Sequence, residues 1–371
     1  MSELTPRAVA WADTMAGHQR AGVISAHAES TARIAGGEPV GREAREAAEA
    51  ARLRPGAALA NGAGQRAIDE EPDVERTCFE RDRDRIVHST AFRRLAGKTQ
   101  VVVFPTDHQR TRLTHALEVA QVATSIARGV GANATLAEAI ALGHDCGHGP
   151  GGHASEDAFD PFLPDGYDHG PWGADVVLTS LNLCAETLDG IRNHSWSRPA
   201  PATIEGEIVS WADRIAYCAH DLEDAVGAGI VSLDELPAEV TEVAGGGRRE
   251  QLATFVRAAV SATCATGQVA MAPEPAAALA ALRAFNYERI YTREESLAQS
   301  RAVVSVLTAL VEYYAAHPAA LPANLRAGDP VRSAVTYVGG MTDRFAFDAA
   351  LSLLGWDPAR LPASSMPGWP G

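Results

Sequence analysis

The stretch RLTHALEVAQVATSIAR, residues 112–128, repeats apolar side chains at helical spacing. A helix over these residues would carry on one face Leu113, Leu117, Ala120 and Ala123. Residues 135–146 form a second apolar segment, with Thr135 as the expected N-cap. In a third, residues 203–226, apolar side chains step by four, three and four positions at Ile204, Ile208, Trp211 and Ile215. With few runs of alternating β-branched residues elsewhere, these segments predict an all-α fold.

The composition is that of a globular chain. Its 371 residues are 46% hydrophobic and 21% charged, and the length is ample for a sizeable core. The longest apolar run, residues 302–311, is too short to cross a bilayer, and the N-terminus lacks the profile of a signal peptide. We therefore expect a cytoplasmic protein with no membrane partner. Its 32 basic and 47 acidic residues give a net charge of −15, which argues against a duplex-DNA coat protein.

The pattern of residues divides the chain into three predicted parts. Residues 1–75 contain a single aromatic residue, Trp11, and predict a flexible Ala/Gly-rich extension, although residues 41–54 have high helix propensity. Residues 76–235 predict a helical core, and residues 236–371 predict further helices packed on it. Clusters of glycine and proline at 148–152 and 160–173 indicate loops beside the core helices.

Five cysteines lie far apart and form no C-x-x-C pair, so neither a disulfide framework nor a zinc ribbon is indicated. We expect buried, reduced thiols at Cys78, Cys146, Cys184, Cys218 and Cys264.

Histidines crowd one region of the sequence. Eight of the 12 lie between residues 108 and 220: His108, His115, His144, His148, His153, His169, His194 and His220. A single histidine most often caps a helix or forms a hydrogen bond in the core. In ALGHDCGH, however, His144 and Asp145 are adjacent on an apolar segment, where burying both is costly unless they are paired, protonated or bound to a cation.

Two more potential ligands flank this pair. His115 lies on the preceding predicted helix and Asp213 on a following one, so three helices can bring two imidazoles and two carboxylates together. This mixed nitrogen and oxygen set suits a six-coordinate Mg, Mn or Fe-type ion with water in its remaining positions, rather than a closed structural zinc site. A metal-bound water indicates hydrolytic chemistry.

The pattern H…HD…D resembles the HD-domain superfamily of metal-dependent phosphohydrolases. Longer blocks resemble the deoxyguanosinetriphosphate triphosphohydrolase (dGTPase) family: FERDRDRIVHSTAFRRLAGKTQV, RTRLTHALEVAQ, EAIALGHDCGHGPGGHASE and IVSWADRIAYCAHDLEDAVGAG. The resemblance covers residues 79–233, and YVGGMTDRFAFDAAL at 337–351 is similar to the family's closing segment. It implies an HD-domain helical fold with additional C-terminal helices, and a phosphohydrolase core at 76–235.

The resemblance also implies catalytic residues. His148 and Glu156 would lie beside the reacting phosphate, and His169, in GYDHGPWG, would act as general acid because its pKa lies near neutrality. An alternative is that His148 only orients Asp145 or a water. His153, in the same loop, is expected to be structural.

Substrate contacts follow from the same resemblance. Asp213, Tyr217 and Asp221 are spaced four apart and share one stripe of a helix. The resemblance implies that Tyr217 and Asp221 meet the sugar, that Gln100 also contacts it, and that Arg112 and Arg214 contact phosphate oxygens. Without the resemblance, Tyr217 and Asp221 are equally well explained as a polar contact between helices.

A run of basic residues stands out in this acidic chain: Arg76, Arg81, Arg83, Arg85, Arg93, Arg94, Lys98, Arg110 and Arg112. Arginine matches phosphate oxygens, so some of them are expected to face a triphosphate. For Arg81, Arg83 and Arg85, which alternate with acidic residues, we expect mostly surface ion pairs.

The chain departs from the family pattern at Gly151 and Gly170, two changes expected to loosen the active-site loop.

These observations predict a metal-dependent enzyme (Mg, Mn or Fe-type ion) that hydrolyses dGTP or another dNTP to deoxynucleoside and inorganic triphosphate. One alternative is an HD-type phosphatase or phosphodiesterase acting on another nucleotide. Another, of a different class, is a regulatory assembly that senses nucleotides or single strands. The resemblance further implies a homo-oligomer, with nucleotide or single-stranded DNA as effector.

Overall fold

The computed structural model describes residues 4–101 and 109–362, and the chain divides into two compact units, residues 1–40 and 41–371. The first unit contains helix α1 (Pro6–Asp13) and a hairpin in which β1 (His18–Arg20) pairs antiparallel with β2 (Val23–Ser25). Gln19 lies opposite Ile24 in this hairpin. The expected division at residues 75 and 235 stays a prediction.

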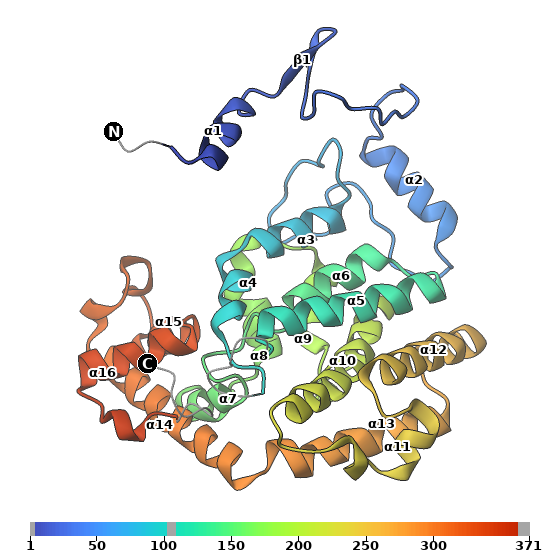
Figure 1. Ribbon diagram of the computed structural model, residues 1–371. Coiled ribbons are helices and arrows are strands. Elements are labelled where there is room, and N and C mark those ends of the chain that lie inside the picture. The colour runs from blue at the N-terminus through green and yellow to red at the C-terminus, as the bar shows by residue number, and fades with distance from the viewer. Residues whose placement is uncertain (1–3, 102–108, 363–371) are drawn as a thin grey trace. The chain divides into compact units, whose positions relative to one another are not determined.

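The second unit is helical (Figure 1). Its α-helices are α2 (Arg42–Arg52), α3 (Cys78–His88), α4 (Thr90–Arg94), α5 (Arg112–Val130), α6 (Ala134–Gly143), α7 (Ala154–Phe159), α8 (His169–Trp172), α9 (Ala185–Asn193), α10 (Ile204–Gly227), α11 (Ala238–Ala244), α12 (Arg248–Thr266), α13 (Pro273–Asn286), α14 (Glu294–Ala316), α15 (Pro330–Gly339) and α16 (Asp343–Leu354). The hairpin is the only sheet among the described residues. The predicted all-α fold with additional C-terminal helices is confirmed.

The three helices predicted from apolar spacing form the centre of the larger core. Helix α5 packs against α6 and α10, and Ile126, Ile140 and Ile208 from these helices are fully buried. Thr203, the first residue of the third predicted segment, is the N-cap of α10, and its side chain accepts from the Gly206 N–H. The N-cap of α6 is Asn133, not Thr135, because the Asn133 side chain reaches the N–H groups of both Thr135 and Leu136.

A second apolar cluster joins α7 to the C-terminal helices α14, α15 and α16. Phe159, Leu310, Val335 and Phe347 are among its buried residues. The apolar run 302–311 lies within α14 and packs there. No helix in the described part of the chain combines the length and apolar character needed to span a membrane.

The segment after α2 is attached to the helical body through polar contacts. The Arg66 side chain is 1% exposed, and its Nη1 lies 2.6 Å from Oδ1 of the fully buried Asp82. The other oxygen of Asp82 accepts hydrogen bonds from the Cys184 N–H and the Thr187 hydroxyl. Arg66 therefore links the chain before α3 to the start of α9.

All five cysteines are free thiols, and four of them are buried as expected. The expectation is wrong for Cys264, which is exposed near the end of α12. The buried residues of this helix are Gln251, Phe255, Ala259 and Thr263, at spacings of four residues, so Cys264 follows the buried stripe and faces away from the core.

Candidate active site

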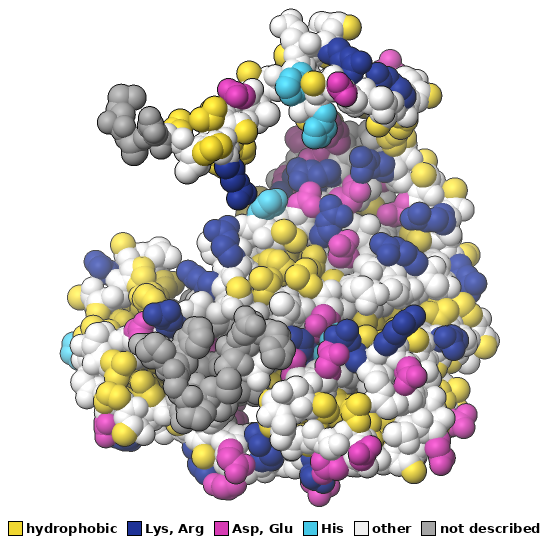
Figure 2. Space-filling view, viewed as in Figure 1, with side chains coloured by type: hydrophobic (Ala, Val, Ile, Leu, Met, Phe, Trp, Pro, Cys, Tyr) yellow, Lys and Arg dark blue, Asp and Glu magenta, His cyan; other side chains and the backbone are white. Residues whose placement is uncertain are grey.

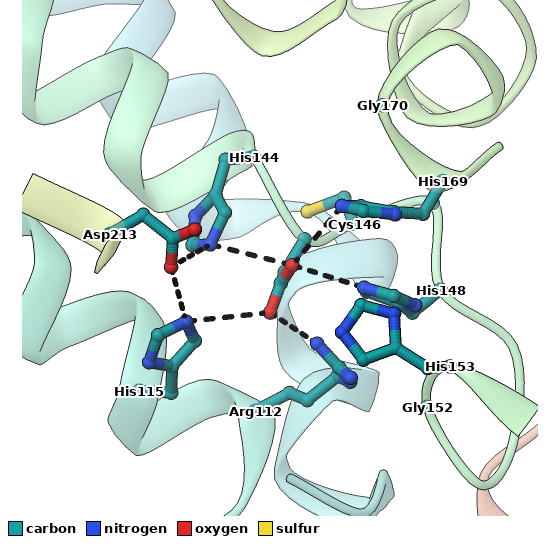
Figure 3. A network of polar contacts seen from close by, with 12 residues as sticks. Arg112, His115, His144, Cys146, His148, Gly152, His153, His169, Gly170 and Asp213 are labelled. Atoms are coloured by element: carbon teal, nitrogen blue, oxygen red, sulfur yellow. Dashed lines mark hydrogen bonds and ion pairs between the residues drawn. The ribbon is translucent and has the colours of Figure 1, made fainter. Parts of the chain in front are cut away.

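The four predicted metal ligands come together where α5, the end of α6 and α10 meet. Figure 3 labels three of them, His115, His144 and Asp213. His115 lies on α5, His144 and Asp145 follow α6 directly, and Asp213 lies on α10. His115 Nε2 is 3.1 Å from Asp213 Oδ1 and 3.8 Å from Asp145 Oδ2. His144 Nε2 is 3.4 Å from Asp145 Oδ1 and 3.7 Å from Asp213 Oδ1.

The buried donors fit a divalent cation. His144 directs Nδ1 to the Ala141 carbonyl oxygen at 2.6 Å, and its Nε2 is buried with no hydrogen-bond partner among the described residues. Burial lowers the pKa of His144, which favours the neutral imidazole that binds metal ions. Burial alone would raise the pKa of Asp213, but the nearby His115 and His144 lower it to about 2. A cation would satisfy this unpartnered nitrogen and balance the carboxylates.

A second group of ionisable side chains adjoins the first. Glu156 lies on α7, and its Oε1 is 2.5 Å from Nδ1 of His169, the first residue of α8. Burial lowers the pKa of His169, but the contact with Glu156 outweighs it and raises the pKa above its ordinary value. Glu156 and His169 therefore form a dyad in which the carboxylate supports the protonated imidazole.

His148 lies behind this dyad. Its ring stacks on the His169 ring with centroids 3.8 Å apart, and its side chain is fully buried. His148 Nε2 is 3.3 Å from Asp145 Oδ1. This position favours the alternative in which His148 orients Asp145.

His153 lies on the cavity wall, although it was expected to be structural. Its side chain is 73% exposed and its Nδ1 is 3.7 Å from Glu156 Oε1. A ring this exposed contributes little to a core, so it is available to a bound ligand.

His194 is a site residue that sequence reasoning did not single out. It caps the C-terminus of α9, where Nδ1 lies 2.8 Å from the Ile191 carbonyl oxygen and Nε2 lies 3.1 Å from His169 Nε2. Burial lowers its pKa to about 3. Its place among the clustered histidines was the only signal, because no acidic residue adjoins it in the sequence.

The two other histidines of the cluster are His220 and His108. His220 contacts Ala216 and Glu118, and His108 lies outside the described residues.

A cavity of about 460 Å³ opens onto the ligand set, a size suited to a small-molecule substrate. Nine of the predicted site residues line it: Gln100, Arg112, His115, Asp145, His169, Asp213, Arg214, Tyr217 and Asp221. His144, His148 and Glu156 lie behind these residues and contact them.

Three arginines line the cavity. Arg112 Nη1 lies 2.6 Å from Asp145 Oδ2. The guanidinium carbon of Arg214 lies 3.4 Å from the centroid of the half-exposed Trp196 ring. The third, Arg283 on α13, was not predicted, because it lies far along the chain from every motif. Its Nε donates to the Tyr217 hydroxyl at 2.8 Å.

Each carboxylate oxygen of Asp221 accepts a hydrogen bond from a different residue. Its Oδ2 accepts from the Tyr291 hydroxyl at 2.5 Å, and its Oδ1 accepts from the buried Arg110 guanidinium. Tyr217 and Asp221 therefore contact other helices, as the alternative interpretation required, and at the same time line the cavity.

The remaining arginines of the basic run mostly form ion pairs. Arg81 and Arg85 both bind Glu70, at 2.7 and 2.6 Å, and Arg83 binds Asp84 at 2.8 Å. On the face shown in Figure 2, basic side chains are interspersed with acidic ones. The ion-pair interpretation of these three arginines is therefore supported, and within this run Arg112 is the arginine that lines the cavity.

The two glycines expected to loosen the loop are instead closely packed. Gly151 has a φ of +72°, and a Cβ there would lie 2.4 Å from Val303 Cγ1. A Cβ on Gly170 would lie 2.8 Å from the Arg192 carbonyl oxygen. Each glycine permits a close approach of backbone that a side chain would prevent.

Comparison with known proteins finds two family domains in this chain. Residues 112–218 match the HD domain, and residues 269–350 match the phosphohydrolase-associated domain. The first match spans His115, His144, Asp145 and Asp213, and the second spans Arg283 and Tyr291.

Curated relatives align over most of the chain. A deoxyguanosinetriphosphate triphosphohydrolase-like protein of Caldanaerobacter subterraneus is 39% identical over 316 residues, covering 82% of this chain and 93% of the relative. A protein of the same description from Clostridium perfringens strain 13 is 40% identical over 296 residues, covering 74% and 86%. One from Rhodopseudomonas palustris is 34% identical, covering 76% and 91%. The chain therefore belongs to the deoxyguanosinetriphosphate triphosphohydrolase-like family of HD-domain phosphohydrolases.

Proposed function

We propose that this protein hydrolyses deoxynucleoside triphosphates at the α-phosphorus, releasing deoxynucleoside and inorganic triphosphate. The observation that carries the proposal is one cavity lined by His115, Asp145 and Asp213, by three arginines, and by Tyr217 and Asp221. The names of the curated relatives, which describe triphosphohydrolase-like proteins, agree with it.

His115, His144, Asp145 and Asp213 would hold the divalent ion. When bound there, the ion would supply Lewis acidity to the reacting phosphate group. Arg112 and Arg214 supply charged donors for the triphosphate oxygens, where developing negative charge is stabilised. Arg283 lines the cavity beside Tyr217 and adds a third positive charge.

His169 is the proposed general acid for the leaving 5′ oxygen. Glu156 accepts a hydrogen bond from Nδ1–H of His169 and raises the pKa of His169, so the imidazolium that must donate a proton from its other nitrogen is stabilised. His148 would orient Asp145, and the exposed His153 is a second group that reaches the cavity. Variants of His169 and His153 would show which ring transfers the proton.

Tyr217 and Asp221 would form the wall against the sugar. Both side chains are fixed by hydrogen bonds to other residues. They would therefore move little to make room for the extra 2′ hydroxyl of a ribonucleotide. Gln100 lines the same cavity and its buried Oε1 has no partner among the described residues, which leaves an acceptor for a sugar hydroxyl.

Product analysis tests the proposal. The purified protein would be incubated with Mn or Mg and each of the four dNTPs, or with GTP, and the products separated by chromatography. We expect free deoxynucleoside and inorganic triphosphate, with GTP turned over more slowly. Release of monophosphate, diphosphate or orthophosphate would overturn the proposal in favour of another HD-type phosphatase or phosphodiesterase. Salt-dependent binding of single strands without turnover would favour the regulatory assembly instead.

A further inference from the structure

The chain contains 31 arginines and a single lysine, Lys98. This residue is 3% exposed. Its ammonium group donates to the main-chain carbonyl of His148, and to that of Gly339 at 2.9 Å. His148 begins the glycine-rich stretch 148–152, here called the active-site loop, and Gly339 is the last residue of α15. One buried ammonium group thus joins the active-site loop to the C-terminal helices.

The next residue, Thr99, joins the same two segments through a carboxylate. Its N–H and hydroxyl donate to Oδ2 of Asp343 at 2.9 and 2.5 Å. The other oxygen, Oδ1, accepts from the Gly151 N–H at 2.8 Å. Asp343 is the first residue of α16 and is 5% exposed. Asp343 accepts all three hydrogen bonds, so the ionised carboxylate, which carries no proton, is the form that satisfies them.

The active-site loop needs such restraints. Gly151 and Gly152 both have positive φ, at +72° and +64°, and consecutive glycines restrict the backbone little on their own. Ser155 adds a further restraint, since its hydroxyl accepts from the Gly149 N–H and donates to the Gly152 carbonyl. The loop begins at His148 and leads into His153, so its conformation sets where both rings lie.

Gln100 follows Thr99 directly and lines the cavity. We propose that Lys98, Thr99 and Asp343 are positioning residues that fix the active-site loop and Gln100 in place relative to each other. A compact ammonium group with three donors reaches two carbonyl oxygens in a buried space, whereas a planar guanidinium group requires more room. This explains a lysine at this position in a chain that otherwise uses arginine. The part of the proposal that concerns turnover rests on the proposed function.

Hydrogen exchange measured by mass spectrometry tests the restraint without any substrate. Asp343→Asn replaces one acceptor oxygen by an NH2 group, so the variant cannot accept from both Thr99 and Gly151. We expect exchange of loop amides in peptides over 148–153 to rise about tenfold, as for loss of a hydrogen bond of about 1.4 kcal/mol. Asp348→Asn is the matched control, because Asp348 lies on the same helix with its side chain 68% exposed. Its exchange and activity should equal those of the wild type.

Metal content and turnover complete the test. We expect metal content in Asp343→Asn to equal that of the wild type while kcat falls about 100-fold, the effect of displacing reacting groups by about 1 Å. Thr99→Val keeps the side-chain shape and loses only the hydroxyl donor, so its kcat should fall less. If Asp343→Asn does not fold, Thr99→Val carries the test, and wild-type kcat in that variant contradicts the proposal.

Unchanged loop exchange in folded Asp343→Asn would overturn the proposal, whatever the activity. Failure of the wild type to release inorganic triphosphate would overturn the proposed function instead, and the exchange result would still decide whether Asp343 restrains the loop.

Discussion

Nη1 of Arg112 lies 2.6 Å from Oδ2 of Asp145, so the arginine proposed to bind phosphate and a proposed metal ligand share one buried ion pair. Burial alone would raise the pKa of Asp145, but Arg112 and the neighbouring histidines hold it well below its ordinary range. Oδ1 of the same carboxylate faces His144 and His148. One aspartate therefore ties the triphosphate side of the cavity to the ligand set.

The Arg112→Met variant separates the two roles. It removes the guanidinium and leaves all four ligands, so we expect wild-type metal content, measured by plasma mass spectrometry. We expect kcat/KM to fall about 100-fold, as when one charge-stabilising donor is lost. Loss of the metal would show that Arg112 is needed for metal binding, and full activity would show that it does not bind the phosphate.

Removing a ligand has a different signature. We expect His115→Ala and Asp213→Ala to lose both metal and activity, by more than about 100-fold, with an unchanged helical circular dichroism spectrum. Cys146→Ala is the control, because Cys146 adjoins Asp145 and burial raises its pKa to about 12, so it is an inert thiol. An active, metal-free Asp213→Ala protein would refute the site assignment.

The buried pair of Arg66 and Asp82 makes a prediction about stability. Arg66→Ala leaves Asp82 buried without its partner, so the free energy of unfolding should fall by about 3–5 kcal/mol. Arg301→Ala breaks an exposed pair with Glu294 and should change it by less than about 1 kcal/mol. Urea unfolding of both variants measures the difference, and equal effects would contradict the structural role of Arg66.

Lys98 predicts a pH dependence of stability. Burial lowers its pKa to about 8 from an ordinary 10.5. Between these values the unfolded chain binds more protons than the folded one, so the contribution of Lys98 to the free energy of unfolding rises with pH and is lost as pH falls through 8.

The measurement is the difference in unfolding free energy between wild type and Lys98→Met. From pH 8 to 10.5, the range between the two pKa values, this difference should grow in favour of the wild type by about 3 kcal/mol. Other titrating groups are common to both proteins and cancel. A difference that stays constant would show that Lys98 is not perturbed by burial.

Much of the site was predictable because its signals are local. The stripe of α10 places Asp213, Tyr217 and Asp221 on one face by spacing alone, and the adjacent pair His144–Asp145 stands out on an apolar segment. The structure brings Asp145 and the three residues of the α10 stripe to one cavity with His115, and His144 lies behind them in contact with Asp145. The predicted all-α fold followed from the same helical periodicity.

Other features depend on contacts between distant segments. Asp343 reaches Gly151, and Arg283 reaches Tyr217, only after the C-terminal helices have packed on the core. Arg66 is polar and lies in a segment poor in apolar residues, so composition alone indicates flexibility there. Its partner, Asp82, is recognisable only once α3 and α9 are placed.

The most direct test of the central claim is hydrolysis of dGTP and the other dNTPs in water enriched in oxygen-18, followed by phosphorus NMR and mass spectrometry. Attack at the α-phosphorus predicts one oxygen-18 atom in a terminal phosphate of the released inorganic triphosphate and none in the deoxynucleoside. Label in orthophosphate or pyrophosphate, or in the deoxynucleoside 5′ hydroxyl, would contradict the account.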